Sequence, residues 1–338
     1  MRIHWHRRDL RVADNRPLVE ADADGPIVPV FVFDRDVLAQ AGPPRVAFML
    51  DALESLREAY RSRGIDLLIR EGDPREMLPE LAGRFDADAV TWARDYSGLA
   101  RERDTDVRQA LDEAGVAREA VHDTVCHEPG AIRTNDGDPY SVFTYFGRKW
   151  HGREKHPAVD PPGREQLADI SDDVPIPTLE ELGFEEPGAS IPPASTAAAR
   201  ERLEAFCEDD IYQYEERRDY PADECTSRLS AHLKFGTIGI REVYEATERA
   251  KRGVDGERLE SVEEFQDQLA WREFYTQVLY FNPEVVTENY KEYEHEIAWQ
   301  EDEDAIQAWK AGRTGYPIVD AGMRQLREEA YMHNRVRM

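Results

Sequence analysis

Apolar residues recur along the first 130 residues of the chain in two alternating patterns. Short runs rich in β-branched residues predict buried strands, at 27–33, 65–69 and 89–92. Apolar residues at helical spacing predict amphipathic helices between and after them, at 45–63, 75–85 and 101–114. Strand and helix units of this length indicate a doubly wound parallel sheet with helices on both faces. We therefore expect an α/β N-terminal domain over residues 1–130.

The pattern changes after residue 130. We expect an interdomain linker over residues 131–195, because the chain from 156 onward is rich in Pro, Gly and acidic residues without sustained periodicity. Residues 196–338 regain helical periodicity in nearly every segment, most clearly at 197–207, 240–252, 262–280 and 304–311. The second domain is predicted to be all-helical.

Length and charge narrow the class of protein. A chain of 338 residues exceeds what one hydrophobic core usually supports, which agrees with two domains. Its formal charge of −27 would repel a nucleic acid in dilute salt. Only six of the 43 basic residues are lysine, however, and acidic residues far outnumber basic ones. A preference for arginine over lysine together with an excess of Asp and Glu indicates adaptation to a salt-rich cytoplasm. At molar salt the Debye length is about 3 Å, so local contacts decide binding.

The cysteines and the apolar runs exclude several other classes. Cys126, Cys207 and Cys225 are widely spaced and form no CxxC pair, so we expect neither a disulfide framework nor a metal site. No charged-then-apolar leader opens the chain, and no apolar run approaches the ~18 residues that span a bilayer. We expect a cytoplasmic protein, without a membrane partner, that acts as a monomer.

Three motifs carry the functional signal. The segment TSRLS, Thr226 to Ser230, offers hydroxyls and backbone N–H groups of the kind that bind a pyrophosphate, although such clusters are usually helix caps. FQDQLAWREFY from Phe265 and YMHNRVRM from Tyr331 combine aromatic rings with arginines at helical spacing. An ordinary core helix would not need that many cationic groups beside that many rings.

Three separated segments carry a family resemblance: HWHRRDLRVADN at His4, TSRLS at Thr226 and MHNRVRM at Met332. On these motifs the whole chain resembles the photolyase/cryptochrome flavoprotein family. Within it the chain is most similar to a haloarchaeal class I cyclobutane pyrimidine dimer photolyase. The resemblance implies an all-α FAD-binding domain and light-driven repair of pyrimidine dimers in DNA by electron transfer from reduced FAD. Members continue past the equivalent of Met338, so it also implies that this chain is incomplete at its C-terminus.

The resemblance assigns cofactor residues. The flavin would be bound by Tyr214, Thr226, Ser227, Arg228, Leu229, Ser230, Phe265 and Arg272. Trp299 resembles the surface member of the family's tryptophan chain, which reduces the flavin by electron transfer. Arg45, in PPRVAF, and Asp95 resemble residues that hold a deazaflavin or folate antenna, although a first-turn arginine would look the same.

A flipped-out pyrimidine pair needs an aromatic wall and a polar group at the base edges. Trp271 would be the wall and Gln268, one helical turn earlier, the catalytic polar group. Further DNA contacts are implied at Arg218, Leu269, Ala270, Arg272, Glu273, Phe274, Tyr275, Asn334, Arg335 and Met338. A core tryptophan with a satisfied amide neighbour would give the same pattern.

The chain departs from the commonest family pattern at Gln268, where members that repair cyclobutane dimers usually carry Glu. Gln is familiar in the (6-4) photolyase and animal cryptochrome branch, but that branch has histidines at Asn334 and Met338. Repair of cyclobutane dimers is therefore the favoured function, and Gln268→Glu is expected to preserve or increase it. A (6-4) photolyase, a cryptochrome-like photoreceptor and an inactive fragment are the alternatives.

Overall fold

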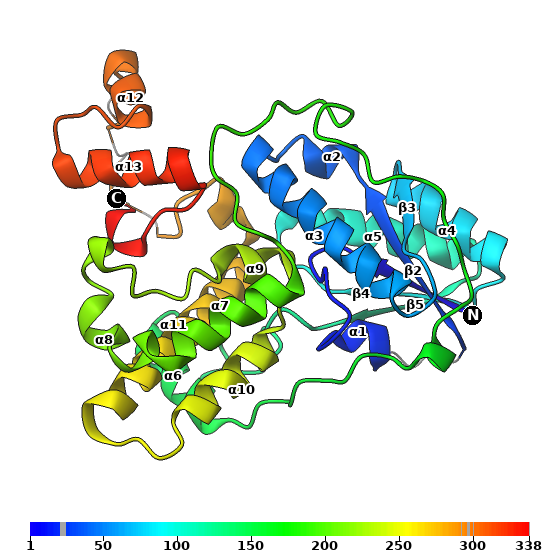
Figure 1. Ribbon diagram of the computed structural model, residues 1–338, viewed down its shortest axis with the longest axis horizontal. Coiled ribbons are helices and arrows are strands. Elements are labelled where there is room, and N and C mark those ends of the chain that lie inside the picture. The colour runs from blue at the N-terminus through cyan, green and yellow to red at the C-terminus, as the bar shows by residue number, and fades with distance from the viewer. Residues whose placement is uncertain (21–24, 292, 296–297, 300, 338) are drawn as a thin grey trace.

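The computed structural model describes residues 1–20, 25–291, 293–295, 298–299 and 301–337. It shows an α/β lobe and a helical lobe side by side (Figure 1). The α/β lobe contains one sheet in the order β3-β2-β1-β4-β5, in which all neighbouring strands are parallel. Its strands are β1 (Arg2–His6), β2 (Ile27–Phe33), β3 (Leu68–Glu71), β4 (Ala89–Ala93) and β5 (Ala117–Val121).

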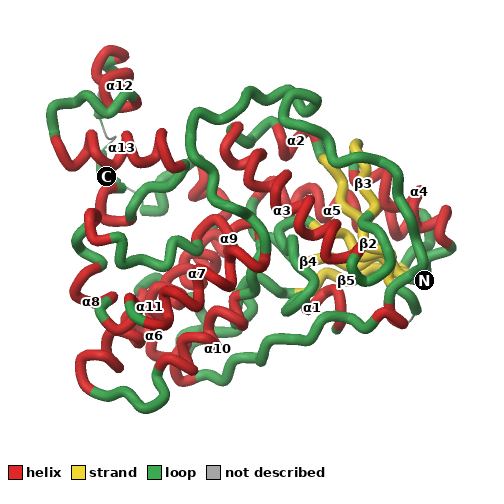
Figure 2. Tube along the Cα trace, in the orientation of Figure 1, coloured by secondary structure: helices red, strands yellow, loops and turns green. Residues whose placement is uncertain are grey.

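Helices cover both faces of this sheet, as the sequence predicts (Figure 2). They are α1 (Arg16–Val19), α2 (Arg35–Leu38), α3 (Pro43–Arg61), α4 (Pro74–Phe85) and α5 (Gly98–Glu113). Side chains alternate between the faces along β2: Phe31 and Phe33 join the core under α3, while Val30 joins the core under α4 and α5. The doubly wound α/β domain is thus confirmed.

The strand expected at 65–69 lies slightly later, at β3, and two strands of the sheet do not appear as apolar runs. In β1, Arg2, His4 and His6 interrupt the apolar pattern, yet all three are buried. The imidazole of His4 lies 3.0 Å from a carboxylate oxygen of Asp9, which supplies the partner that a buried polar group needs. β5 is a partly exposed edge strand and therefore needs little apolar surface.

The helical lobe is built around one long helix, α11 (Gly256–Phe281). Its other helices are α6 (Phe143–Gly152), α7 (Thr196–Glu208), α8 (Tyr214–Arg217), α9 (Ser230–Phe235), α10 (Ile240–Ala250), α12 (Glu303–Lys310) and α13 (Pro317–Glu329). The predicted all-helical domain is confirmed. Short 3₁₀ turns lie at Arg164–Gln166, Asp210–Tyr212, Pro221–Asp223, Pro283–Val286 and Asn334–Val336.

The segment expected to be a linker contributes to both lobes. Phe146 and Trp150 of α6 belong to the core of the helical lobe. Leu167, Leu179 and Leu182, which follow in largely irregular chain, pack into the core of the α/β lobe under α3. The extended path between the lobes is therefore held on both sides by buried apolar contacts.

Buried ion pairs join the lobes. Arg241 of α10 contacts Asp14 at 2.5 Å and Asp123 at 2.6 Å, and Arg11 contacts Asp123 at 2.5 Å. All four side chains are at most 3% exposed. A side chain at Gly239 would collide with the Asp14 carboxylate, so the close approach of α10 requires glycine there. This cluster fixes the relative position of the two lobes.

Within the described part of the chain, no helix is both long and apolar enough to cross a bilayer.

Candidate functional site

A groove of about 880 Å³ opens in the helical lobe, beside α11. All the residues predicted to bind the flavin line it, together with arginines and Tyr331 of the C-terminal motif. They come from separate segments: α8 supplies Tyr214, the loop before α9 supplies TSRLS, and α11 supplies Phe265 and Arg272. The fold thus brings together predicted flavin residues that are up to 58 positions apart in the sequence, from Tyr214 to Arg272.

The TSRLS segment turns sharply before it enters α9. Arg228 has a φ of +49°, a left-handed conformation that is uncommon for a residue with a side chain. Its guanidinium reaches Glu329 at 2.8 Å, and the hydroxyl of Thr226 lies 3.2 Å from that of Tyr331. Thr226 and Ser227 are half-buried, and Ser230 is exposed. Hydroxyls and a guanidinium along one wall of a long groove suit the phosphate and ribityl parts of FAD.

Trp271 lies in a stack of aromatic rings on the groove wall. Its ring stacks on Phe143 of α6 with 3.8 Å between centroids, and on Tyr275 with 5.4 Å between centroids. Phe143 thus covers part of the indole, while Trp271 and the exposed Tyr275 face the groove. A flat, partly exposed ring supported from behind can stack on a nucleobase.

Gln268 lies one turn before Trp271 and takes part in a polar chain. Its Nε2 donates to Oε1 of Glu264 at 3.0 Å, and the same oxygen is paired with the guanidinium of Arg218. Arg218 also lies over the ring of Tyr214, 5.7 Å from its centroid. Burial raises the pKa of Glu264, and the charge of Arg218 opposes that effect.

Three residues of α11 that were predicted to contact DNA do not line the groove. Ala270 and Phe274 are buried in the helical core, and Glu273 is 4% exposed. The Glu273 carboxylate accepts hydrogen bonds from the backbone N–H groups of Cys126 and His127, at 2.8 and 3.1 Å. The expectation that these three contact DNA is wrong, because the far side of α11 packs against the protein.

The C-terminal motif places Asn334 and Arg335 at the groove, and Arg335 donates to Asp219 at 2.5 Å. His333 is 4% exposed and its ring accepts from the backbone N–H of Arg335, which is a structural role. Trp299 is 76% exposed and does not line the groove. Met338 lies outside the described residues.

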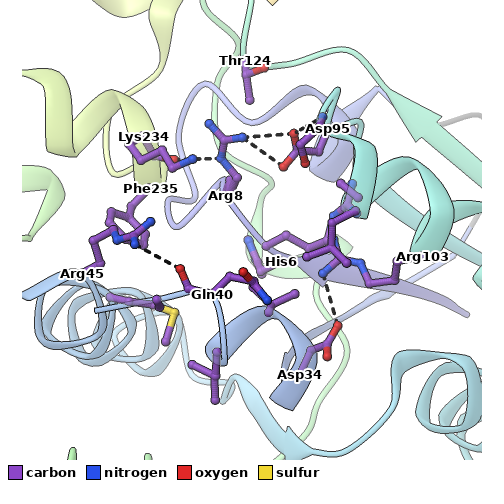
Figure 3. Close-up of a pocket in the computed structure, with 18 of the residues that line it drawn as sticks. His6, Arg8, Asp34, Gln40, Arg45, Asp95, Arg103, Thr124, Lys234 and Phe235 are labelled. Atoms are coloured by element: carbon purple, nitrogen blue, oxygen red, sulfur yellow. Dashed lines mark hydrogen bonds and ion pairs between the residues drawn. The ribbon is translucent and has the colours of Figure 1, made fainter. Parts of the chain in front are cut away.

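A second cavity, of about 430 Å³, lies between the sheet and the helical lobe (Figure 3). Both residues predicted to hold an antenna, Arg45 and Asp95, line it. Arg8 donates to both carboxylate oxygens of Asp95, at 3.0 and 3.1 Å, and to the backbone oxygen of Lys234 at 3.1 Å. Arg45 donates to the backbone oxygen of Gln40. Apolar side chains from β2 and α3 complete the cavity.

Three cationic side chains, Arg8, Lys234 and Arg272, line both cavities. The charge of Arg8 and partial loss of hydration lower the pKa of Lys234 to about 8. Loss of hydration, followed by the charge of Arg8, also lowers the pKa of Arg272. Anionic groups in either cavity would be stabilised by this shared wall.

Within the described residues, His4, His6 and Asp9 lie close enough together to hold a cation. Every ring nitrogen of the two histidines already has a protein partner: Thr91 and Asp9 for His4, and Asp9 and Tyr60 for His6. Burial lowers the pKa of His4 to about 4. The group is a satisfied hydrogen-bond network inside the sheet.

Sequence reasoning missed Glu264, Phe143, Arg8 and Lys234 as lining or supporting residues. Glu264 carries a detectable signal, because it precedes Gln268 by four residues and so lies on the same face of α11. The other three reach the site only through tertiary packing.

Comparisons with known proteins agree with this geometry. Residues 2–163 match the family model of DNA photolyase, and residues 265–338 match that of the FAD binding domain of DNA photolyase. The deoxyribodipyrimidine photo-lyase of Halobacterium salinarum is 60% identical, over 100% of this chain and 73% of its own length. The deoxyribodipyrimidine photo-lyase of Synechococcus is 38% identical, over 98% of this chain and 71% of its own length.

Solved structures show the same architecture. A class III photolyase of Agrobacterium tumefaciens superposes with a TM-score of 0.88 at 32% identity, over 99% of this chain and 70% of its own. The Sulfolobus tokodaii photolyase, whose structure contains two FAD molecules and implicates a novel light-harvesting cofactor, superposes with a TM-score of 0.81 at 29% identity. The match covers 99% of this chain and 72% of that one. On the combined evidence of motifs, fold, groove and relatives, the chain belongs to the DNA photolyase family.

Proposed function

We propose that this protein repairs cyclobutane pyrimidine dimers in DNA, using FAD in the groove of the helical lobe. The observation that carries the proposal is the convergence of the predicted flavin residues and the half-buried Trp271 on one groove. Relatives that align with nearly all of this chain are named deoxyribodipyrimidine photo-lyases, which supports pyrimidine dimers as the substrate.

The groove residues bind and orient rather than react. Reduced FAD would supply one electron to the dimer in a light-driven step, and the electron returns to the flavin at the end. Two C–C bonds of the cyclobutane ring are broken and two C5–C6 double bonds are formed, with no net oxidation. Trp271, supported by Phe143, stacks on the flipped dimer, and Gln268 contacts a base edge. Arg335 lies exposed at the groove, where it can hold a phosphate of the DNA backbone.

The interdomain cavity is proposed to hold an antenna chromophore, of the deazaflavin, folate or flavin class. Its apolar walls suit a ring system, and Arg8, Arg45 and Lys234 suit an anionic group on that ring. Arg272 lines both this cavity and the groove, so the two cavities are neighbours. An antenna in this cavity would therefore lie next to the flavin site to which it passes excitation energy.

A repair assay tests the proposal. The protein, reconstituted with FAD, reduced and kept in molar salt, is mixed with an oligothymidylate that contains cyclobutane dimers. We expect illumination to restore the absorbance of the thymines near 260 nm, and dark controls to show no change. Absence of light-dependent recovery from a protein that has bound FAD would refute dimer repair. Sedimentation of the same sample would test the expectation of a monomer.

A further inference from the structure

Glu264 lines the groove, although it belongs neither to the predicted flavin residues nor to the predicted DNA contacts. It lies on α11 one turn before Gln268, on the face that also carries Trp271 and Tyr275. Its side chain is 24% exposed, and it is paired with Arg218, which is 22% exposed. A carboxylate held by a guanidinium at the edge of a substrate groove sets the hydrogen-bonding direction of any amide that touches it.

We propose that Glu264 orients the amide of Gln268 so that its carbonyl oxygen faces the lesion, and that the site thereby selects a pyrimidine edge with an N–H donor. This inference rests on the proposed function and deepens it. Glu264 acts as a positioning residue, because it works through Gln268 and makes no contact with the reacting atoms.

The direction of the Gln268 amide follows from its partners. An ionised carboxylate only accepts hydrogen bonds, and Oε1 of Glu264 accepts from both Arg218 and Gln268. Gln268 must therefore present its NH₂ group to Glu264, and Nε2 lies 3.0 Å from that oxygen. The backbone oxygen of Glu264, at 3.5 Å from Nε2, receives the second N–H. With both donors directed at Glu264, the carbonyl oxygen is the group left for a ligand.

A carbonyl oxygen at the base edge distinguishes pyrimidines by their chemistry. Thymine and uracil carry an N–H donor at N3, between two carbonyl groups, which a single acceptor satisfies. Cytosine has an acceptor at N3, so an oxygen directed at N3 would face a lone pair, and the nearest donor is the amino group at C4. The arrangement therefore favours dimers whose contacted base is thymine or uracil.

The test combines Glu264→Leu with a chemical change in the substrate. One oligonucleotide contains a thymine cyclobutane dimer, and a second contains the same dimer methylated at N3, which has no donor. Dissociation constants are measured in the dark, with flavin-loaded protein in molar salt. We expect Glu264→Leu to weaken binding of the unmodified dimer about tenfold, as loss of one oriented hydrogen bond does, and to leave binding of the methylated dimer unchanged.

Two further variants make the result interpretable. Glu263→Leu is the matched control, because Glu263 lies on the same helix and pairs with Lys251 at 3.2 Å but does not line the groove. We expect it to bind both substrates as the parent does. Glu264→Gln keeps the side-chain volume, and we expect a smaller loss with the same restriction to the unmodified dimer.

The outcomes separate this inference from the proposed function. Equal losses by Glu264→Leu on both substrates would mean that Glu264 only supports the structure, and would overturn the inference alone. If the parent protein bound dimer-containing and undamaged DNA equally, the proposed function and the inference would both be overturned.

Discussion

Gln268→Glu creates a second carboxylate beside Glu264. The atoms involved are the Nε2 of Gln268, which the substitution replaces by oxygen, and Oε1 of Glu264, 3.0 Å away. Two full charges at that separation repel by about 5 kcal/mol at an effective dielectric constant of about 20. Arg218 and surrounding water cancel much of this repulsion. The free protein can relieve the rest by rotating residue 268 away from Glu264, and binding of the dimer requires its return, so we expect a net cost of about 1–2 kcal/mol, or roughly tenfold in affinity for dimer DNA.

The pH dependence of this variant has a definite sign. Neighbouring carboxylates raise each other's pKa, and Glu264 already has a raised pKa because of burial. As the pH falls, the pair takes up one proton, the repulsion disappears and the affinity of Gln268→Glu for the dimer should recover. The double variant Glu264→Gln, Gln268→Glu has a single carboxylate and should bind well at neutral pH.

The assay is a dark binding titration of dimer-containing oligonucleotide against pH. From the sequence alone, Gln268→Glu is expected to preserve or increase repair, since relatives carry Glu there; Glu264 changes this expectation. A single variant that binds as tightly as the parent protein across the pH range, or a double variant no better than the single, would refute the electrostatic reasoning.

Three other outcomes follow from the structure. Trp271→Ala should cost about 1–3 kcal/mol of dimer binding through lost stacking while flavin stays bound, and equal affinity of variant and parent in a gel-shift assay would exclude that role. Arg241→Ala leaves Asp14 and Asp123 without their shared buried partner, and should lower the free energy of unfolding by about 3–5 kcal/mol in a denaturant titration. Transfer from molar to dilute salt should lower the melting temperature, because a net charge of −27 is no longer screened; an unchanged melting temperature would contradict the halophilic interpretation.

The sequence predicts the architecture well where apolar residues alternate regularly. β2 and α3 are examples, because each buries a clear apolar set. β1 is missed because His4 and His6 are polar, and their burial depends on Asp9, Thr91 and Tyr60, which only the fold brings near. Periodicity cannot reveal such a buried hydrogen-bond network.

The groove residues divide in a similar way. Gln268 and Trp271 are predictable from the motif and its helical spacing. The family resemblance also implied a DNA contact at Glu273. That residue instead anchors the backbone of Cys126 and His127, since a motif does not show which side of a helix faces the core. Phe143 comes from a helix inside the expected linker, and its stack on Trp271 arises only from tertiary packing.

Flavin content tests the central claim most directly. We would record the near-ultraviolet and visible absorption of protein purified in molar salt in the dark, before and after incubation with FAD. The account predicts flavin bands at close to one FAD per chain in the groove, reduced by substitutions at Tyr214 or Arg228 and unaffected by Glu263→Leu. A folded protein that stays colourless after incubation with FAD would contradict the assignment of the groove.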